Sequence, residues 1–93
     1  MNIGDLKHAV TLQQPLRAPD DGGGFAVSWQ EVAQAYAHIA EGADGKTAAA
    51  TLRWRNDLVA GMRLVRDESL FRIVSLRDPD GNREWLELRV VRE

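Results

Sequence analysis

Hydrophobic and polar residues alternate over short stretches of this chain, which is the pattern of β-strands with one buried face. The first such stretch spans residues 8–14, where Val10 and Leu12 share one face between polar neighbours. Pro15 follows directly, and proline cannot donate a hydrogen bond within a sheet. We therefore predict a strand over residues 8–14 that ends at Pro15.

A turn and a second strand are predicted next. Residues 19–24 have the sequence Pro-Asp-Asp-Gly-Gly-Gly, in which the glycines accept the positive φ angles of tight turns. Phe25, Val27 and Trp29 then alternate with small or polar residues. We predict a strand over residues 25–30 with these three side chains in the core.

Residues 31–40 fit two patterns. Four apolar residues have helical spacing, namely Val32, Ala35, Tyr36 and Ile39. Residues 36–39 are also typical of a strand. We favour a short turn over residues 31–33 followed by a strand.

The next segments are a loop over residues 41–45 and a strand over residues 47–55, in which Leu52 and Trp54 share a face. The alanine run at residues 48–50 leaves a helical turn open as the alternative.

The C-terminal third has a firmer strand pattern. Residues 62–66 and 70–76 predict a hairpin across residues 67–69. Residues 78–81, Asp-Pro-Asp-Gly, match the preferences of a type I turn. A last strand is predicted over residues 84–91, and its core-facing residues are Leu86, Leu88 and Val90.

Six short strands in 93 residues predict an all-β protein. We expect a small six-stranded antiparallel β-barrel with extended loops, formed by a single domain over residues 1–93.

Composition excludes several classes of function. The net charge of −2 argues against a dedicated nucleic-acid binder, and the absence of cysteine excludes disulfides and thiolate metal sites. No apolar run resembles a signal peptide or reaches membrane-spanning length, so we expect a soluble protein made in the cytoplasm and no membrane contact.

One loop partly matches a phosphate-binding P-loop, because residues 45–47 are Gly-Lys-Thr. The first glycine of that motif is replaced by Ala40, and Glu41 and Asp44 bring carboxylates where phosphate would sit. We predict a solvated loop without a nucleotide.

Other chemical motifs are incomplete. Residues 78–84 resemble a calcium loop, but the glycine stands at the fourth place and Arg89 occupies the twelfth, so a hairpin turn is the better interpretation. His8 and His38 lie on separate predicted strands, and the serines have no adjacent base. We predict no enzyme, no metal site and no cofactor.

Trp85 is on the face of the last strand opposite to its core residues. An exposed tryptophan on a barrel is costly unless it is covered, so Trp85 either anchors an interface or packs under a local loop.

The order of these features resembles the phage head–tail joining family, also called head-closure or stopper proteins of long-tailed phages. The resemblance covers nearly the whole chain and rests on these segments: Ile3-Gly4-Asp5-Leu6-Lys7-His8, Val10-Thr11-Leu12-Gln13-Gln14-Pro15, Asp21-Gly22-Gly23-Gly24-Phe25, Trp29, Val32-Ala33, Tyr36-Ala37, Gly61-Met62-Arg63, Phe71-Arg72-Ile73-Val74-Ser75, Asp78-Pro79-Asp80 and Glu87-Leu88.

The resemblance implies a ring of copies between the portal–adaptor complex of a filled capsid and the tail, in a virion assembled in the host cytoplasm. The implied partners are portal and adaptor ring proteins, tail terminator or tail tube proteins, and other copies of the chain, with double-stranded DNA passing through without sequence-specific binding. A mildly acidic protein suits such a channel, because a basic lumen would retain the phosphates.

Two departures from the family pattern matter. Relatives carry a longer, partly helical insertion between Ala40 and Leu52, so a channel-plugging role is not implied here. The hairpin at residues 67–68 also lacks the glycine that relatives often have, which indicates a different turn.

Contact with other subunits is expected at two polar segments and at the unusual tryptophan. These residues are Asp21, Gly22, Gly23, Gly24, Glu41, Gly42, Asp44, Lys46 and Trp85. The alternative function is a nucleic-acid-binding module of the OB type, with Trp54 as a stacking residue flanked by Arg53 and Arg55.

Overall fold

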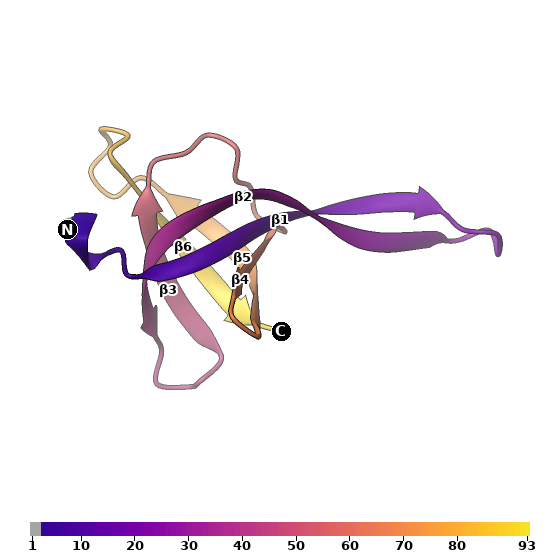
Figure 1. Ribbon diagram of the computed structural model, residues 1–93, viewed down its shortest axis with the longest axis horizontal. Coiled ribbons are helices and arrows are strands. Elements are labelled where there is room, and N and C mark those ends of the chain that lie inside the picture. Colours follow the sequence, from indigo (N-terminus) through magenta and orange to yellow (C-terminus); the bar gives the residue numbers. More distant parts are fainter. Residues whose placement is uncertain (1–2) are drawn as a thin grey trace.

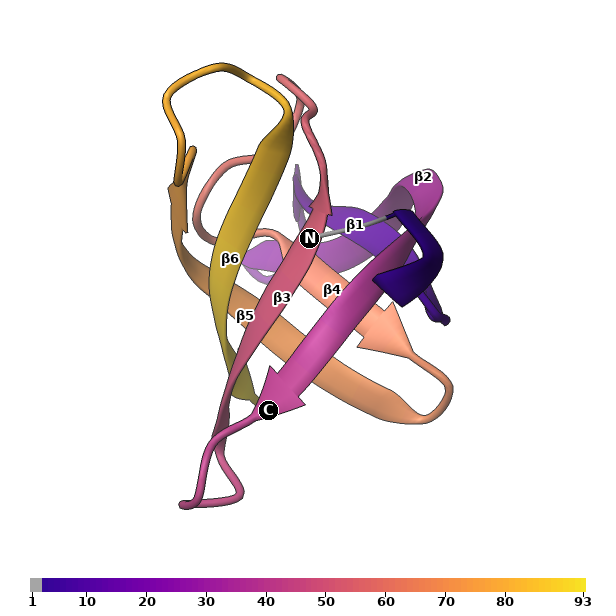
Figure 2. The same cartoon turned by 90° about the vertical axis from the view of Figure 1, so that its left-hand side faces the viewer.

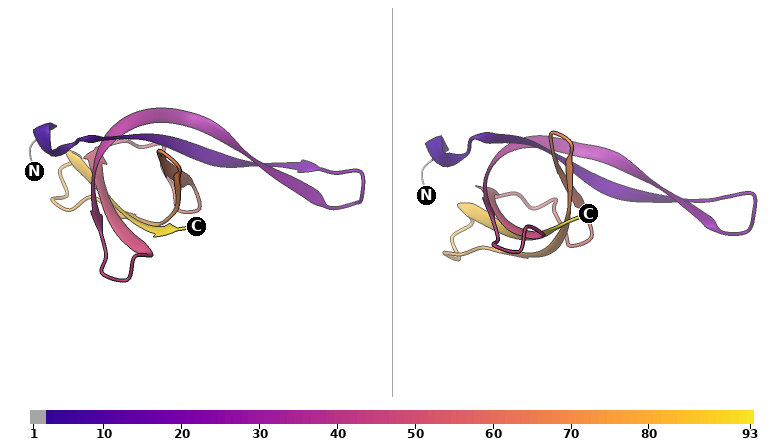
Figure 3. Two further views of the ribbon diagram at one scale, coloured as in Figure 1. Left: turned by 60° about the horizontal axis from the view of Figure 1, so that its bottom comes forward. Right: turned by 90° about the horizontal axis from the view of Figure 1, so that it is seen from below.

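The computed structural model describes residues 3–93, which form one antiparallel sheet of six strands. A short 3-10 helix, η1, precedes the strands, and the elements are η1 Ile3–Asp5, β1 His8–Pro19, β2 Phe25–Glu41, β3 Thr47–Arg53, β4 Arg63–Arg66, β5 Ser69–Arg77 and β6 Trp85–Arg92. The sheet closes on itself in the order β1-β2-β3-β6-β5-β4 (Figure 1, Figure 3). The expected all-β fold of six antiparallel strands is therefore confirmed. Within residues 3–93, no helix is long and apolar enough to cross a membrane.

The ring of strands is uneven, because β1 and β2 are far longer than the others. They contain 12 and 17 residues, whereas β4 contains 4. β1 pairs with β4 only over residues 11–13, and β2 pairs with β3 only over residues 38–41. Residues 14–30 pair only with one another and leave the ring as a two-stranded hairpin, which we call the arm (Figure 1). The arm gives the molecule its longest dimension, 49 Å.

Because of the arm, the predicted end of the first strand and the predicted start of the following turn are both wrong. Pro15 does not end the first strand, because β1 continues to Pro19. Both prolines lie beyond the part of β1 that pairs with β4, so their missing N–H groups remove no hydrogen bond to a second neighbour. The predicted loop around residue 19 is thus the end of an extended strand.

The predicted turn over residues 31–33 is also wrong, because β2 runs through it without interruption. Leu12 pairs with Ala33 and Gln13 pairs with Glu31, so Val32 is an extra residue, a β-bulge. A bulge shifts the alternation by one place. Val32, Ala35 and Ile39 therefore all pack against the core although they do not alternate strictly, whereas Tyr36 is exposed.

The remaining boundaries differ by one or two residues. β3 ends at Arg53, and the N–H of Trp54 instead donates to the carbonyl oxygen of Glu84 at 3.1 Å. The β4–β5 hairpin turns at residues 67–68, where Asp67 takes φ 51°, a left-handed conformation that aspartate accepts better than most residues. The predicted turn over residues 78–81 is confirmed by a 3.3 Å hydrogen bond from Gly81 N–H to the carbonyl of Asp78.

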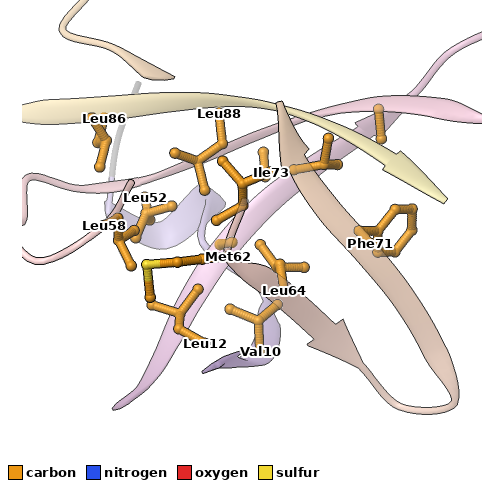
Figure 4. Close-up of a cluster of buried hydrophobic side chains, with 14 residues drawn as sticks. Val10, Leu12, Leu52, Leu58, Met62, Leu64, Phe71, Ile73, Leu86 and Leu88 are labelled. Atoms are coloured by element: carbon orange, nitrogen blue, oxygen red, sulfur yellow. The ribbon is translucent and has the colours of Figure 1, made fainter. Parts of the chain in front are cut away.

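The core fills the interior of the ring. Leu86, Leu88 and Val90 are buried there, as predicted. Figure 4 shows Leu86 and Leu88 beside core residues from β1, β4 and β5. The connection before β4 adds Leu58 and Met62. The predicted core positions of Phe25 and Val27 are wrong: these side chains are 69% and 53% exposed, because they lie on the arm and not on the ring.

Candidate functional site

The tip of the arm is a hydrogen-bonded turn that contains four of the predicted contact residues. The carboxylate of Asp20 accepts hydrogen bonds from the N–H groups of Gly22 at 2.9 Å and Gly24 at 3.0 Å. Gly23 takes φ 83°, which glycine allows without strain. Asp21 and the three glycines are therefore held exposed at the point farthest from the ring (Figure 1).

Apolar side chains gather on one face of the arm. Directly paired residues share a face of an antiparallel ladder, and the face repeats every second residue. The pairs on this face, which we call the arm face, are Pro15–Trp29, Arg17–Val27 and Pro19–Phe25. The opposite face has no aromatic residue; it pairs Leu16 with Ser28 and Ala18 with Ala26 and carries a hydrogen bond from Gln14 Nε2 to Gln30 Oε1 at 2.9 Å.

The root of the arm is held by a cluster around Trp29. Arg63 on β4 and Arg72 on β5 stack on its ring, and both arginines bind the Glu93 carboxylate at 2.7 and 2.6 Å. Burial by itself would raise the pKa of Glu93, but the hydrogen bonds from the two arginines outweigh it and lower the pKa. Trp29 is thus half-buried at the edge of the ring, not in the predicted core.

The second predicted contact segment is the turn between β2 and β3, residues 41–46. The Asp44 carboxylate accepts hydrogen bonds from the N–H groups of Lys46 and Thr47, each at 2.9 Å. The hydrogen bond from Thr47 N–H, followed by that from Lys46, lowers the pKa of Asp44. The carboxylate of Asp44 therefore occupies the amides that a P-loop would offer to a phosphate.

The same turn is attached to β6. Arg92 Nη2 binds the Glu41 carboxylate at 3.1 Å, and Arg92 N–H donates to the carbonyl of Lys46 at 2.6 Å. This turn and the arm tip extend from different sides of the molecule (Figure 1). The predicted contact residues consequently form two separate surfaces.

Trp85 belongs to neither surface. It is 7% exposed, and the guanidinium of Arg53, its direct partner on β3, lies 5.3 Å from the centre of the ring. Its expected exposure is wrong, and packing within the chain is the alternative that the structure supports. The argument for Trp85 as an interface anchor rested on exposure, so it no longer stands.

The residues of the OB-type alternative have partners within the chain. Trp54 packs half-buried against the core, and Arg53 lies over Trp85. Arg55 forms two hydrogen bonds of 2.9 Å with the Asp57 carboxylate, which raise the pKa of Arg55 and lower that of Asp57. A stacking platform would need these groups to be free, so the structure weakens this alternative.

Metal-binding groups do not converge. Residues 3–93 contain no cluster of three or more histidine, aspartate or glutamate side chains able to hold a metal ion. His8 pairs with Ala37, so the adjacent His38 points to the opposite face of the sheet.

One feature near β2 was not predicted. A shallow, mainly apolar groove of about 500 Å³ lies beside Tyr36 and Trp54, and we call it the Tyr36 groove. Its lining residues are Leu6, Gln34, Ala35, Tyr36, Leu52, Arg53, Trp54 and Arg55. Its residues come from three distant segments, so periodicity within one segment could not reveal it.

Comparison with known proteins decides the family. The whole chain, residues 1–93, matches the family model described as phage head completion protein. This chain belongs to the phage head completion protein family. The predicted resemblance to head–tail joining proteins is confirmed, and so is the prediction of a structural protein that is not an enzyme.

Two solved structures share the fold of this head completion protein. Protein SF1141 from Shigella flexneri 2a matches with a TM-score of 0.77 at 23% identity, over 100% of this chain and 96% of that one. A chain of the virion of the native gene transfer agent (GTA) particle matches with a TM-score of 0.72 at 18% identity, over 95% of this chain and 94% of that one. No curated protein sequence matches the chain.

Membership of a family of particle proteins suggests that the exposed arm is a contact surface. Structural proteins of particles act through the surfaces that they present to neighbours, and large exposed apolar side chains mark such surfaces. In this head completion protein, Phe25 and Val27 on the arm and Tyr36 in the groove are exposed side chains of this kind that the sequence did not reveal. The one signal for them in the sequence is the pair of prolines, Pro15 and Pro19, which are typical of an edge strand. Among residues 3–93, the other large exposed apolar residues are Leu16, Val59, Leu70 and Val74.

Proposed function

We propose that this head completion protein is a structural connector of a long-tailed phage or phage-like particle. It forms a ring between the portal–adaptor complex of the filled capsid and the tail, around the channel for DNA. The match of all 93 residues to the head completion family carries this proposal. The shared fold of a chain in the gene transfer agent virion supports it.

The proposed partners are portal or adaptor ring proteins, tail terminator or tail tube proteins, and other copies of the chain. DNA passes through the ring without sequence-specific contact. The net charge of −2 suits this role, because a strongly basic channel would retain the DNA phosphates.

The arm tip and the β2–β3 turn are the proposed contacts with neighbouring copies and with capsid or tail proteins. Asp21 at the tip and Lys46 in the turn are both exposed, and the two segments leave different sides of the molecule. One copy is thereby able to meet two neighbours at once. We expect the isolated chain to be a monomer or a weak oligomer, because contacts of modest area do not offset the entropy of association until a partner fixes the geometry.

Particles produced without this gene test the function directly. Electron microscopy should show DNA-filled heads and separate, complete tails, and the wild-type chain supplied from a plasmid should restore joined particles. Joined, infectious or DNA-delivering particles in the absence of the gene would rule out the connector role.

Charge reversal then tests the two contact segments. Asp21→Lys and Lys46→Glu should each reduce the number of joined particles, because each inverts the charge offered to a partner. Glu68→Lys in the exposed β4–β5 turn is the matched control and should leave joining intact. Equal joining by all three variants would remove both segments from the proposed interface.

A further inference from the structure

The arm face exposes more apolar surface than an isolated chain needs. Phe25 and Val27 are largely exposed on it, with the ring of Pro19 beside Phe25. At the root of the arm, Arg63 and Arg72 cover the ring of Trp29, whereas Phe25 and Val27 lie farther out on the same face and stay exposed. Exposed aromatic and aliphatic side chains on an ordered hairpin are typical of a docking surface.

The Tyr36 groove is the complementary surface on the same chain. Its floor is mainly apolar, and Tyr36 at its edge is 64% exposed. Leu6, which follows η1, lines the groove, and η1 lies at the end of the molecule away from the arm tip (Figure 1, Figure 2, Figure 3). The apolar side chains of the arm and the apolar groove thus lie toward opposite ends of the molecule.

Within one molecule these two surfaces cannot meet. Phe25 and Tyr36 belong to the same strand, β2, which pairs with β1 over this whole length. Eleven residues of strand at about 3.3 Å each separate them by about 36 Å along the strand. The occupant of the groove must therefore come from another molecule.

The charges of the two surfaces favour a second copy of this chain as the occupant. The arm carries two carboxylates at its tip, those of Asp20 and Asp21, against one cation on the arm face, Arg17. The groove is lined by Arg53 and Arg55. Arg55, whose side chain is 28% exposed, forms an ion pair with Asp57 at 2.9 Å. Opposite charges on the two surfaces align an arm with a groove and disfavour contact between two arms.

A contact between two different surfaces of identical chains has a geometric consequence. It is heterologous, so each bound copy leaves one arm and one groove free for the next copy. Such a contact closes into a ring when the rotation between neighbours allows it. This is the assembly that a connector requires.

We propose that the arm face of one copy docks in the Tyr36 groove of the next copy, with Val27 of the first close to Tyr36 of the second. The inference rests on the proposed ring and names the contact that builds it. Phe25 lies next to Val27 along the same face and enters the apolar part of the groove.

Disulfide cross-linking tests this contact, because the natural chain contains no cysteine. Val27→Cys and Tyr36→Cys proteins are mixed in equal amounts at about 1 mM, where a contact with a millimolar Kd is substantially occupied, and mildly oxidised. The mixed dimer should exceed the control product at least about tenfold, because docking holds the two thiols at a high effective concentration. The control replaces Tyr36→Cys by Val74→Cys, a position on β5 that is 49% exposed and lies on neither surface.

The doubly substituted protein, with Val27→Cys and Tyr36→Cys in one chain, gives a second readout. Oxidation should produce a ladder of oligomers or a closed ring, because every copy then carries both halves of the contact. In the mixture of single variants, a predominance of Val27→Cys homodimers would show that arms pair with arms. Mixed dimers no more abundant than those of the Val74→Cys control would show that the groove does not receive the arm. Either result overturns the inference.

Particle joining separates this inference from the proposed function. If the cross-links are absent while the same variants, kept reduced, still restore joined particles, the connector role stands and the arm-in-groove contact is wrong. If the cross-links form while particles lacking the gene are still joined, the contact stands and the connector role is wrong.

Discussion

The guanidinium carbon of Arg63 lies 3.9 Å from the centre of the Trp29 ring, which ties the root of the arm to strand β4. Arg72 approaches the same ring at 4.9 Å, and the Glu93 carboxylate binds both arginines. A two-stranded hairpin alone is marginally stable in water. This cluster of one aromatic ring, two cations and one carboxylate therefore determines where the arm points.

Replacing Trp29 with Ala should release the arm without unfolding the ring. We expect the free energy of unfolding to fall by about 1–2 kcal/mol, the range of a partly desolvated cation–π contact. Amide hydrogen exchange measured by NMR should accelerate over residues 14–30 and stay unchanged in β6. Trp29→Phe keeps an aromatic ring and is the matched control, and unchanged exchange in the Ala variant would show that the cluster does not hold the arm.

Acid should weaken the β2–β3 turn through Asp44. Hydrogen bonds from the N–H groups of Thr47 and Lys46 lower the pKa of this carboxylate in the folded chain. A carboxylate with a lowered folded pKa stabilises the fold above its unfolded pKa of about 4, and that contribution disappears as the pH falls through the folded value. Thermal unfolding should therefore show a Tm that falls below about pH 4 in the wild type.

The variant Asp44→Asn isolates this contribution. Its Tm at pH 7 should be lower than that of the wild type, and the difference should shrink at pH 3. Asp80→Asn, in the exposed β5–β6 turn, is the control and should follow the wild-type curve. Parallel Tm curves for wild type and Asp44→Asn would show that the charge of Asp44 does not support the turn.

Leu88 is the strongest test of the core. It has no exposed surface and lies at the centre of β6. Leu88→Ala should lower the free energy of unfolding by about 2–5 kcal/mol, because a cavity remains inside the closed ring. Chemical denaturation measures this, with Val74→Ala on the outside of β5 as the control, and a loss below roughly half a kcal/mol would contradict the assignment.

The Gly-Lys-Thr sequence at residues 45–47 should not bind nucleotide. The carboxylate of Asp44 already accepts the hydrogen bonds from Lys46 and Thr47 and would repel a phosphate. Calorimetry with ATP and magnesium should show no heat of binding. A micromolar Kd that Lys46→Ala abolishes would contradict this prediction.

Alternation and turn residues were enough to predict that six strands surround the core. Alternation at Leu86, Leu88 and Val90 predicted β6 and its buried face correctly, because an interior with one covered face requires apolar residues at every second position. The turn at residues 78–81 was equally predictable, since Asp and Gly at its ends supply the required hydrogen bond and positive φ. The order of such segments along the chain was enough to indicate the family that the family model confirms.

Which strand faces are covered depends on contacts between strands that are distant along the chain. Phe25 and Val27 alternate as regularly as the residues of β6, yet they lie exposed on the arm, whereas Trp85 is buried on the face predicted to be open. Alternation along one strand reports that its two faces differ, but whether a face meets the core, solvent or a neighbour depends on where the other strands stop. The arm exists because β1 pairs with β4, and β2 with β3, over only a few residues each. The lengths of these paired stretches depend on segments that are distant in the chain.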